Sequence, residues 1–111
     1  MSWMKSLRGA KPGVPKLQLT AAAIADLDDI DAYGAAHFGE DAADSYAAAL
    51  RHALDLLEGF PRSAPSRDDF GPGIRCRSFR SHLILHVVEN ETVLVVRILH
   101  HTQDVKRALK P

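Results

Sequence analysis

Two long helical patterns joined by a single glycine place the tightest limit on what this chain can form. Residues 21–38 and 40–58 are rich in alanine, leucine and aspartate, with apolar side chains repeating every three or four positions. Thr20 is a good N-cap for the first helix, and Gly39 ends it. Because one residue leaves almost no linker, the helices should run antiparallel. We therefore expect a helical hairpin that stops at Gly59.

The rest of the chain carries the pattern of strands. The predicted strands cover residues 16–20, 74–79, 82–89 and 92–100. Asn90 and Glu91 separate the last two strands and are typical of a two-residue hairpin turn, since asparagine tolerates positive φ. A short helix is expected at 104–109. The order β-α-α-β-β-β plus a short C-terminal helix predicts a two-layer α+β fold, with the helical hairpin packed on an antiparallel sheet.

The hairpin turn predicts which side chains share a face of the sheet. If Glu89 pairs with Thr92, one face is wholly apolar and should pack on the helices. This face holds Leu83, Leu85, Val87, Leu94, Val96 and Ile98. The opposite face mixes histidines and Arg97 with apolar side chains such as Ile84 and Val95. A face of that kind should bind a partner, unless the C-terminal tail or the N-terminal arm covers it.

Length and composition indicate one small protein domain. The chain has 111 residues, so we expect a single domain at 16–111 after a flexible N-terminal arm at 1–15, which is rich in glycine and proline. No apolar run reaches the roughly 20 residues of a membrane helix, and no secretory signal is visible. Cys76 is the single cysteine. These features predict a cytoplasmic protein without membrane contact.

The net charge of zero conceals an uneven distribution. Residues 1–16 carry four basic side chains and no acidic one. Residues 17–69 have a net charge of −8, and residues 70–111 have a net charge of +4. This asymmetry favours oriented association with charged partners, although solvated helix faces would give the same pattern.

The residues with chemical potential give weak signals for catalysis. His100 and His101 point to opposite faces of a strand, so we expect no metal and no other cofactor. Cys76 should face the core. No convergent acid and base are apparent, so no catalytic residue is assigned, and no single histidine substitution should behave as the loss of a general base.

Arginines give a sharper signal. Arg75, Arg77 and Arg80 alternate along one strand, and Arg97 lies on the last strand. Such clusters suit nucleic acids or acidic protein segments, or they simply keep an outer strand soluble. No aromatic residues are interleaved for base stacking, so direct DNA binding by this chain alone is not expected.

The order of motifs resembles ParE-like toxins of the RelE/ParE superfamily. The matching segments are Leu17-Gln18-Leu19-Thr20, Ala25-Asp26-Leu27 with Ile30 and Tyr33, the stretch 43–57, Phe60-Pro61, Gly73-Ile74-Arg75 and, most specifically, Arg97-Ile98-Leu99-His100-His101-Thr102-Gln103-Asp104. The last segment is similar to the family's R-(I/L)-L-H-x-x-x-D signature. The resemblance covers about residues 16–109.

This resemblance implies the toxin of a type II toxin–antitoxin pair. It is expected to inhibit DNA gyrase by binding and to be neutralised by a ParD-like antitoxin. Candidate target-binding residues are Arg97, Lys106, Arg107 and His101, and candidate antitoxin-binding residues are Arg75, Arg77, Ile84 and Val95. The alternatives are a ribosome-dependent mRNA endoribonuclease of the RelE type, or a degenerate homologue that retains only antitoxin binding.

The sequence departs from the nuclease branch of this superfamily. That branch uses arginine or lysine on the sheet and a tyrosine or histidine near the C-terminus. Here the last tyrosine is Tyr46, and Leu83 stands where the nuclease branch has an arginine. Loss of a general acid or base should remove most of the rate. His100 and His101 are the residues that could still support cleavage.

Overall fold

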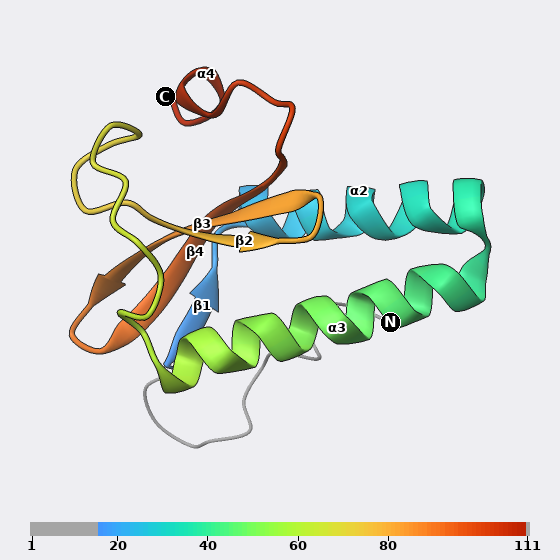
Figure 1. Cartoon of the computed structure of the whole chain (residues 1–111), viewed down its shortest axis with the longest axis horizontal. Coiled ribbons are helices and arrows are strands. Elements are labelled where there is room, and N and C mark those ends of the chain that lie inside the picture. The colour runs from blue at the N-terminus through green and yellow to red at the C-terminus, as the bar shows by residue number, and fades with distance from the viewer. Residues whose placement is uncertain (1–15, 111) are drawn as a thin grey trace.

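A computed structural model describes residues 16–110, and the predicted arm at 1–15 lies outside them. The elements are β1 (Leu17–Leu19), α2 (Ala21–Phe38), α3 (Glu40–Gly59), β2 (Arg75–Phe79), β3 (His82–Glu89), β4 (Thr92–His100) and α4 (Val105–Ala108). The predicted order is therefore confirmed, with ends that differ by one residue at most. Figure 1 shows the α2–α3 hairpin extending past the strands and α4 at the top of the view, with the strands between α4 and α3, which confirms the α+β fold.

The helical hairpin forms where its capping residues place it. The Thr20 hydroxyl oxygen accepts a hydrogen bond from the Ala23 amide at 3.0 Å, which satisfies one free donor of the first turn of α2. Gly39, at φ 90°, is the C-cap of α2 and the N-cap of α3. A Cβ on Gly34 would lie 3.4 Å from the Cβ of Ala43. The two small residues thus let α2 and α3 approach closely.

The sheet is mixed rather than wholly antiparallel. Its strand order is β1-β4-β3-β2. The pairs β2–β3 and β3–β4 are antiparallel as predicted, but β1 runs parallel to β4. The antiparallel expectation was wrong for β1 because the helical hairpin returns the chain to the end of the sheet from which β1 starts. β2 and β4 therefore run in the same direction as β1.

The turn between β3 and β4 has the predicted geometry. Asn90 and Glu91 have φ values of 50° and 64°, as a tight hairpin turn requires. The pairs from Glu89–Thr92 to His86–Val95 confirm the predicted register. A β-bulge then shifts the register, so that Leu85 pairs with Arg97.

The face assigned to the helices was wrong. The helix-side core contains fully buried Ile84 and Val95, which were predicted to face a partner. The remaining residues of this core are Leu17, Ala23, Leu27, Leu50, Leu54, Leu57, Ala64, Val93 and Ile98. Of the six side chains predicted to pack on the helices, Ile98 alone belongs to it, because the bulge moves Ile98 to this side.

A second apolar cluster covers the other face of the sheet. It is built from Ile74, Cys76, Leu85, Leu99 and Val105, with Val105 supplied by α4. The prediction that Cys76 faces a core is thus confirmed. With apolar side chains on both faces of β3 and β4, alternation could not show which face the helices cover.

Candidate functional site

An open groove of about 800 Å³ lies between the helical hairpin and the sheet. Its lining comes from α2 (Asp29, Ile30, Asp31, Tyr33, Gly34, Phe38), from α3 (Ala42, Ala43, Tyr46, Ala47, Leu50), and from the sheet and its β2–β3 turn (Arg80, Ser81, His82, His100). Most of these side chains are small, aliphatic or aromatic. The groove can therefore accept an apolar segment of a partner.

Exposed aromatic side chains extend the groove to the outer end of the hairpin. Tyr33 and Phe38 are 59% and 71% exposed. The His37 ring stacks on Tyr33 with centroids 3.9 Å apart, and its Nδ1 lies 2.9 Å from the Tyr33 carbonyl oxygen. Large apolar groups exposed beside a groove are typical of an interaction surface.

A hydrogen-bonded tyrosine and histidine form the floor of the groove at the sheet. Tyr46 Oη lies 2.6 Å from His82 Nδ1. Burial lowers the pKa of His82, and the neighbouring His100 and His101 lower it further. Burial also raises the pKa of Tyr46. A neutral His82 can therefore accept a hydrogen bond from the Tyr46 hydroxyl at Nδ1 and carry its own proton on Nε2.

This contact brings together two titratable side chains that the sequence analysis did not pair. Tyr46 lies on α3 and His82 lies 36 residues later, at the start of β3. Nothing in the local sequence of either residue indicated the contact, because it depends on how α3 crosses the sheet. The pair places a hydroxyl group and an imidazole side by side in the lining of the groove.

Two further histidines lie beside His82. The His82 and His100 ring centroids are 5.4 Å apart, and the His100 and His101 rings stack at 4.5 Å. His100 Nδ1 is 2.7 Å from the Thr102 hydroxyl oxygen. Among residues 16–110, no three His, Cys, Asp or Glu side chains are placed to hold a metal ion.

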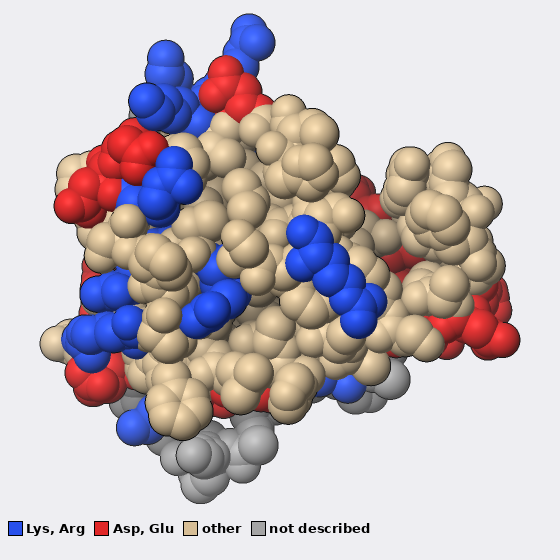
Figure 2. All heavy atoms as spheres, viewed as in Figure 1, with Lys and Arg blue, Asp and Glu red and all other residues tan. Residues whose placement is uncertain are grey.

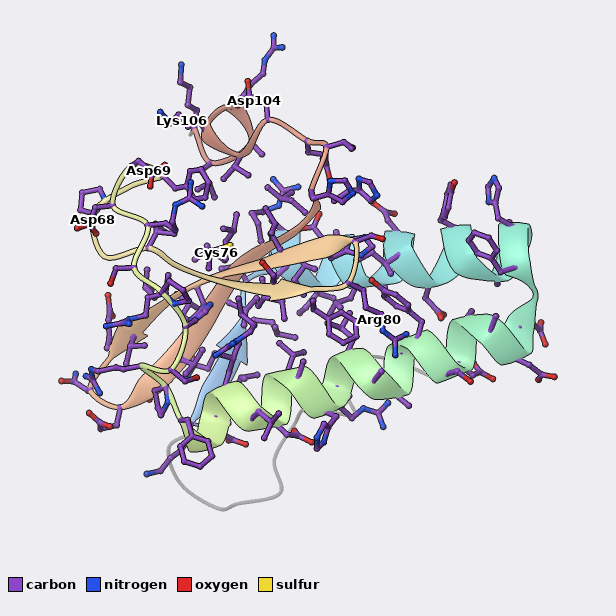
Figure 3. All side chains as sticks on the ribbon, in the orientation of Figure 1. Asp68, Asp69, Cys76, Arg80, Asp104 and Lys106 are labelled. Carbon is purple, nitrogen blue, oxygen red and sulfur yellow. The ribbon has the colours of Figure 1, made fainter. Side chains whose placement is uncertain are left out.

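Arg80 gives the groove a basic end. Figure 3 shows it projecting from the β2–β3 turn toward α3. Its guanidinium carbon lies 5.4 Å from the centroid of the Tyr46 ring and 5.3 Å from that of Phe79, within the range of a cation–π contact. Asp29 and Asp31 line the groove from α2. The groove thus offers negative charge on one wall and positive charge at another.

Arg97, a predicted target-binding residue, forms an ion pair with Asp26. Its Nε and Nη2 atoms donate to the Asp26 carboxylate at 2.7 and 2.9 Å. A third donor, Nη1, reaches the Ala108 carbonyl oxygen at 3.3 Å, and the Ile98 amide also donates to Asp26. The hydrogen bond with Asp26 raises the pKa of Arg97. Arg97 thus ties α2 and α4 to β4.

The predicted target-binding residues near the C-terminus are exposed. Lys106 and Arg107 lie on α4, and His101 lies in the turn that precedes it. Val105 anchors α4 in the second apolar cluster, and Asp104 caps it by accepting from the Arg107 amide at 3.2 Å. Figure 3 shows Lys106 pointing from α4 into solvent.

The predicted antitoxin-binding residues divide into two groups. Arg75 Nη1 donates to the Ala64 carbonyl oxygen at 2.8 Å, and Arg77 Nη2 donates to the Ser63 hydroxyl at 2.9 Å. These arginines fix the loop after α3 and remain half-exposed. Ile84 and Val95 are inside the core and cannot contact a partner.

Charge is unevenly distributed over the surface. Figure 2 shows Lys and Arg over the sheet and the C-terminal end, with several Asp and Glu beside them, whereas in this view the outer end of the helical hairpin carries Asp and Glu and no group of Lys and Arg. The surface therefore offers a basic region and an acidic region to different parts of a partner.

Within residues 16–110, no helix is long and apolar enough to cross a membrane.

Comparison with known proteins identifies the family. Residues 17–105 match the model of the ParE toxin of the type II toxin–antitoxin system parDE. The chain is 38% identical over 92 residues to Toxin ParE1 of Mycobacterium tuberculosis, covering 82% of this chain and 94% of the relative. It is 27% identical over 92 residues to Toxin ParE1 of Caulobacter vibrioides, covering 83% and 95%.

A solved structure shows the same fold. It belongs to a chromosomal ParDE toxin–antitoxin system from P. aeruginosa, and it superposes with a TM-score of 0.68 at 21% identity. The match covers 77% of this chain and 94% of that chain. The family match and the sequence relatives confirm the resemblance drawn from the motifs, and this chain belongs to the ParE toxins of type II toxin–antitoxin systems.

Proposed function

We propose that this toxin acts in the cytoplasm by binding DNA gyrase, and that a ParD-like antitoxin neutralises it by occupying the groove. The assignment of the antitoxin-binding site rests on the groove of about 800 Å³, which has exposed Tyr33 and Phe38 at its outer end. An amphipathic helix can place its apolar side chains in such a groove.

The charges along the groove restrict what the antitoxin segment contains. Basic side chains of the segment would pair with Asp29 and Asp31 on α2, and an acidic side chain would pair with Arg80. Arg75 and Arg77 lie on β2, half-exposed, and they can receive further acidic side chains. The segment is therefore expected to be amphipathic, with both signs of charge on its polar side.

The contact with gyrase is assigned to the C-terminal basic surface, defined as His101, Lys106 and Arg107. All three side chains are exposed. His101 directly follows His100, which lines the end of the groove. An antitoxin segment that leaves the groove past His100 would therefore cover the start of the C-terminal basic surface. This placement explains how one segment could block the target contact.

A supercoiling assay tests the target. The parent chain should inhibit gyrase, and the charge-reversed pair Lys106→Glu with Arg107→Glu should not. Lys16→Glu is the matched control, because Lys16 is also exposed but lies at the start of β1. A folded parent chain that binds its antitoxin but leaves supercoiling unchanged would remove gyrase as the target.

RNA cleavage is a second candidate function, and the Tyr46–His82 pair is the observation that favours it. A general acid or base contributes about 10²–10⁴-fold in rate. Ribosome-dependent cleavage should therefore be measured for the parent, His82→Gln and His101→Ala, with folding checked by circular dichroism. Under the binding mechanism, none of the three cleaves RNA. Cleavage by the parent that is lost in either folded variant would place this toxin among the nucleases.

A further inference from the structure

We propose that residues 1–15 of this chain, the N-terminal segment, bind back into the groove of the same molecule when no partner occupies it. The segment precedes β1 and lies before the family match, which begins at residue 17. It is therefore an addition to the shared domain, and the proposal does not depend on which target the toxin has.

The N-terminal segment has the composition that the groove would accept. It carries Lys5, Arg8 and Lys11 and no acidic residue. Trp3 and Leu7 are large apolar side chains spaced among these bases. Such a segment can place its apolar side chains against an apolar wall while its bases meet acidic side chains at the rim.

The helical hairpin supplies the complementary surface. Residues 21–59 contain nine acidic side chains and one arginine. Asp29 and Asp31 belong to the groove itself, beside exposed Tyr33 and Phe38. Figure 2 shows acidic side chains, and no cluster of basic ones, around this outer end of the hairpin. Attraction over the ~8 Å screening length of physiological salt thus favours a basic segment there.

The length of the segment is sufficient. The described chain begins at Lys16, whose carbonyl oxygen accepts a hydrogen bond from the Val93 amide. Fifteen extended residues reach about 50 Å. The longest dimension of the molecule is 38 Å. The segment can therefore reach the groove from where the domain begins.

The covalent connection decides between binding within one molecule and binding between molecules. A short flexible linker gives an effective concentration in the millimolar range. A protein solution at about 5 µM offers roughly 200-fold less of the segment from other molecules, so the contact forms within the same molecule far more readily than between molecules.

Trp3 is the single tryptophan of the chain and reports directly on the segment. Quenching of its fluorescence by acrylamide should be measured in the full-length protein at 1 and 50 µM, with the unfolded chain in guanidinium as reference. We expect Trp3 in the folded parent to be protected relative to the unfolded chain, equally at both concentrations.

Neighbouring residues of α2 provide a matched pair of variants. Asp29 lines the groove, whereas Asp28 is exposed and outside the lining. Asp29→Lys should weaken docking by about two- to tenfold, as expected for replacing one exposed attraction by a repulsion, and Trp3 quenching should rise. Asp28→Lys should leave quenching near the parent value. Phe38→Ser, at a 71% exposed position, should also raise quenching without unfolding the chain.

Three outcomes would overturn the proposal. The first is quenching of Trp3 in the folded parent that equals quenching in the unfolded chain. The second is an equal response to Asp28→Lys and Asp29→Lys, with Phe38→Ser silent. The third is protection that appears only at 50 µM, which would assign the groove to a second copy of the chain.

Discussion

Replacing Asp26 with asparagine tests whether Arg97 acts through the fold or through direct contact with the target. The Asp26 carboxylate accepts two hydrogen bonds from Arg97 and one from the Ile98 amide. The side chains of Arg97 and Asp26 are 26% and 12% exposed. The substitution keeps the shape of the side chain but removes its charge, so it leaves a mostly enclosed guanidinium without its counter-ion.

The expected loss of stability follows from this partial burial. Hydrogen bonds to charged groups contribute about 1.5–3 kcal/mol, and breaking a fully buried pair costs about 3–5 kcal/mol. Because a quarter of the Arg97 side chain is exposed, Asp26→Asn should lower the free energy of unfolding by about 2–3 kcal/mol. For a chain of this length, this loss corresponds to a decrease of roughly 8–13 °C in Tm.

A double-mutant cycle separates the pair from its surroundings. Urea unfolding followed by circular dichroism should be measured for Asp26→Asn, Arg97→Gln and both together, and the coupling should exceed about 1 kcal/mol. The exposed pair of Arg62 and Glu91, whose N–O distance is 2.8 Å, is the matched control. Its coupling should stay below about 0.5 kcal/mol. Equal coupling in the two cycles would refute the argument from burial.

The same variants address toxicity. Arg97 Nη1 also contacts the Ala108 carbonyl oxygen, so loosening Arg97 should loosen α4, which carries Lys106. Asp26→Asn should therefore reduce toxicity at temperatures where the protein is still folded. Full toxicity in Asp26→Asn together with loss in Arg97→Gln would instead give Arg97 a direct target contact.

Reversing the charges of Lys106 and Arg107 should abolish toxicity in growth assays without unfolding the protein; unchanged toxicity would move the target contact elsewhere. Burial lowers the pKa of His86 below the ordinary value of about 6.5, so the unfolded chain takes up this proton first as the pH falls. The contribution of neutral His86 to the free energy of unfolding is therefore complete above about pH 6.5, and it decreases toward lower pH by up to about 1.4 kcal/mol per pH unit. Urea unfolding midpoints measured from pH 7.5 to 5.5 should therefore depend less on pH in His86→Leu than in the parent. Gly34→Ala should raise stability by about 0.5–1 kcal/mol, since its Cβ would make ordinary contact with Ala43, and a lower Tm would show that the helices cannot accept the methyl group.

Local signals in the sequence were sufficient to predict where the helices and strands begin and end and which residues cap the helices. Thr20 and Gly39 act within one turn of the helices that they bound, and Asn90-Glu91 acts within its own hairpin. Each of these depends on nearby backbone geometry, which residue types restrict directly. The order of elements followed from them.

The faces of the sheet and the groove depended on distant contacts. His86 is fully buried, although the histidines were among the reasons for assigning their face of the sheet to a partner. The His86 Nδ1 atom lies within hydrogen-bond distance of the Ile84 carbonyl oxygen, and burial lowers the pKa of His86, which favours the neutral form. The bulge at Leu85 and the Tyr46–His82 contact are likewise set by tertiary packing. No periodicity within one strand or helix reports such contacts.

The single residue between α2 and α3 has a consequence for how the groove recognises anything. Gly39 caps both helices, so no loop exists that could lengthen or swing to widen the hairpin. The helices approach closely at Gly34 and Ala43, which further limits their relative motion. The groove is thus pre-organised, and a flexible partner segment loses most of the conformational entropy when the two associate. The affinity of the partner segment for the toxin should therefore change more when the segment is made stiffer than when the toxin is made more flexible.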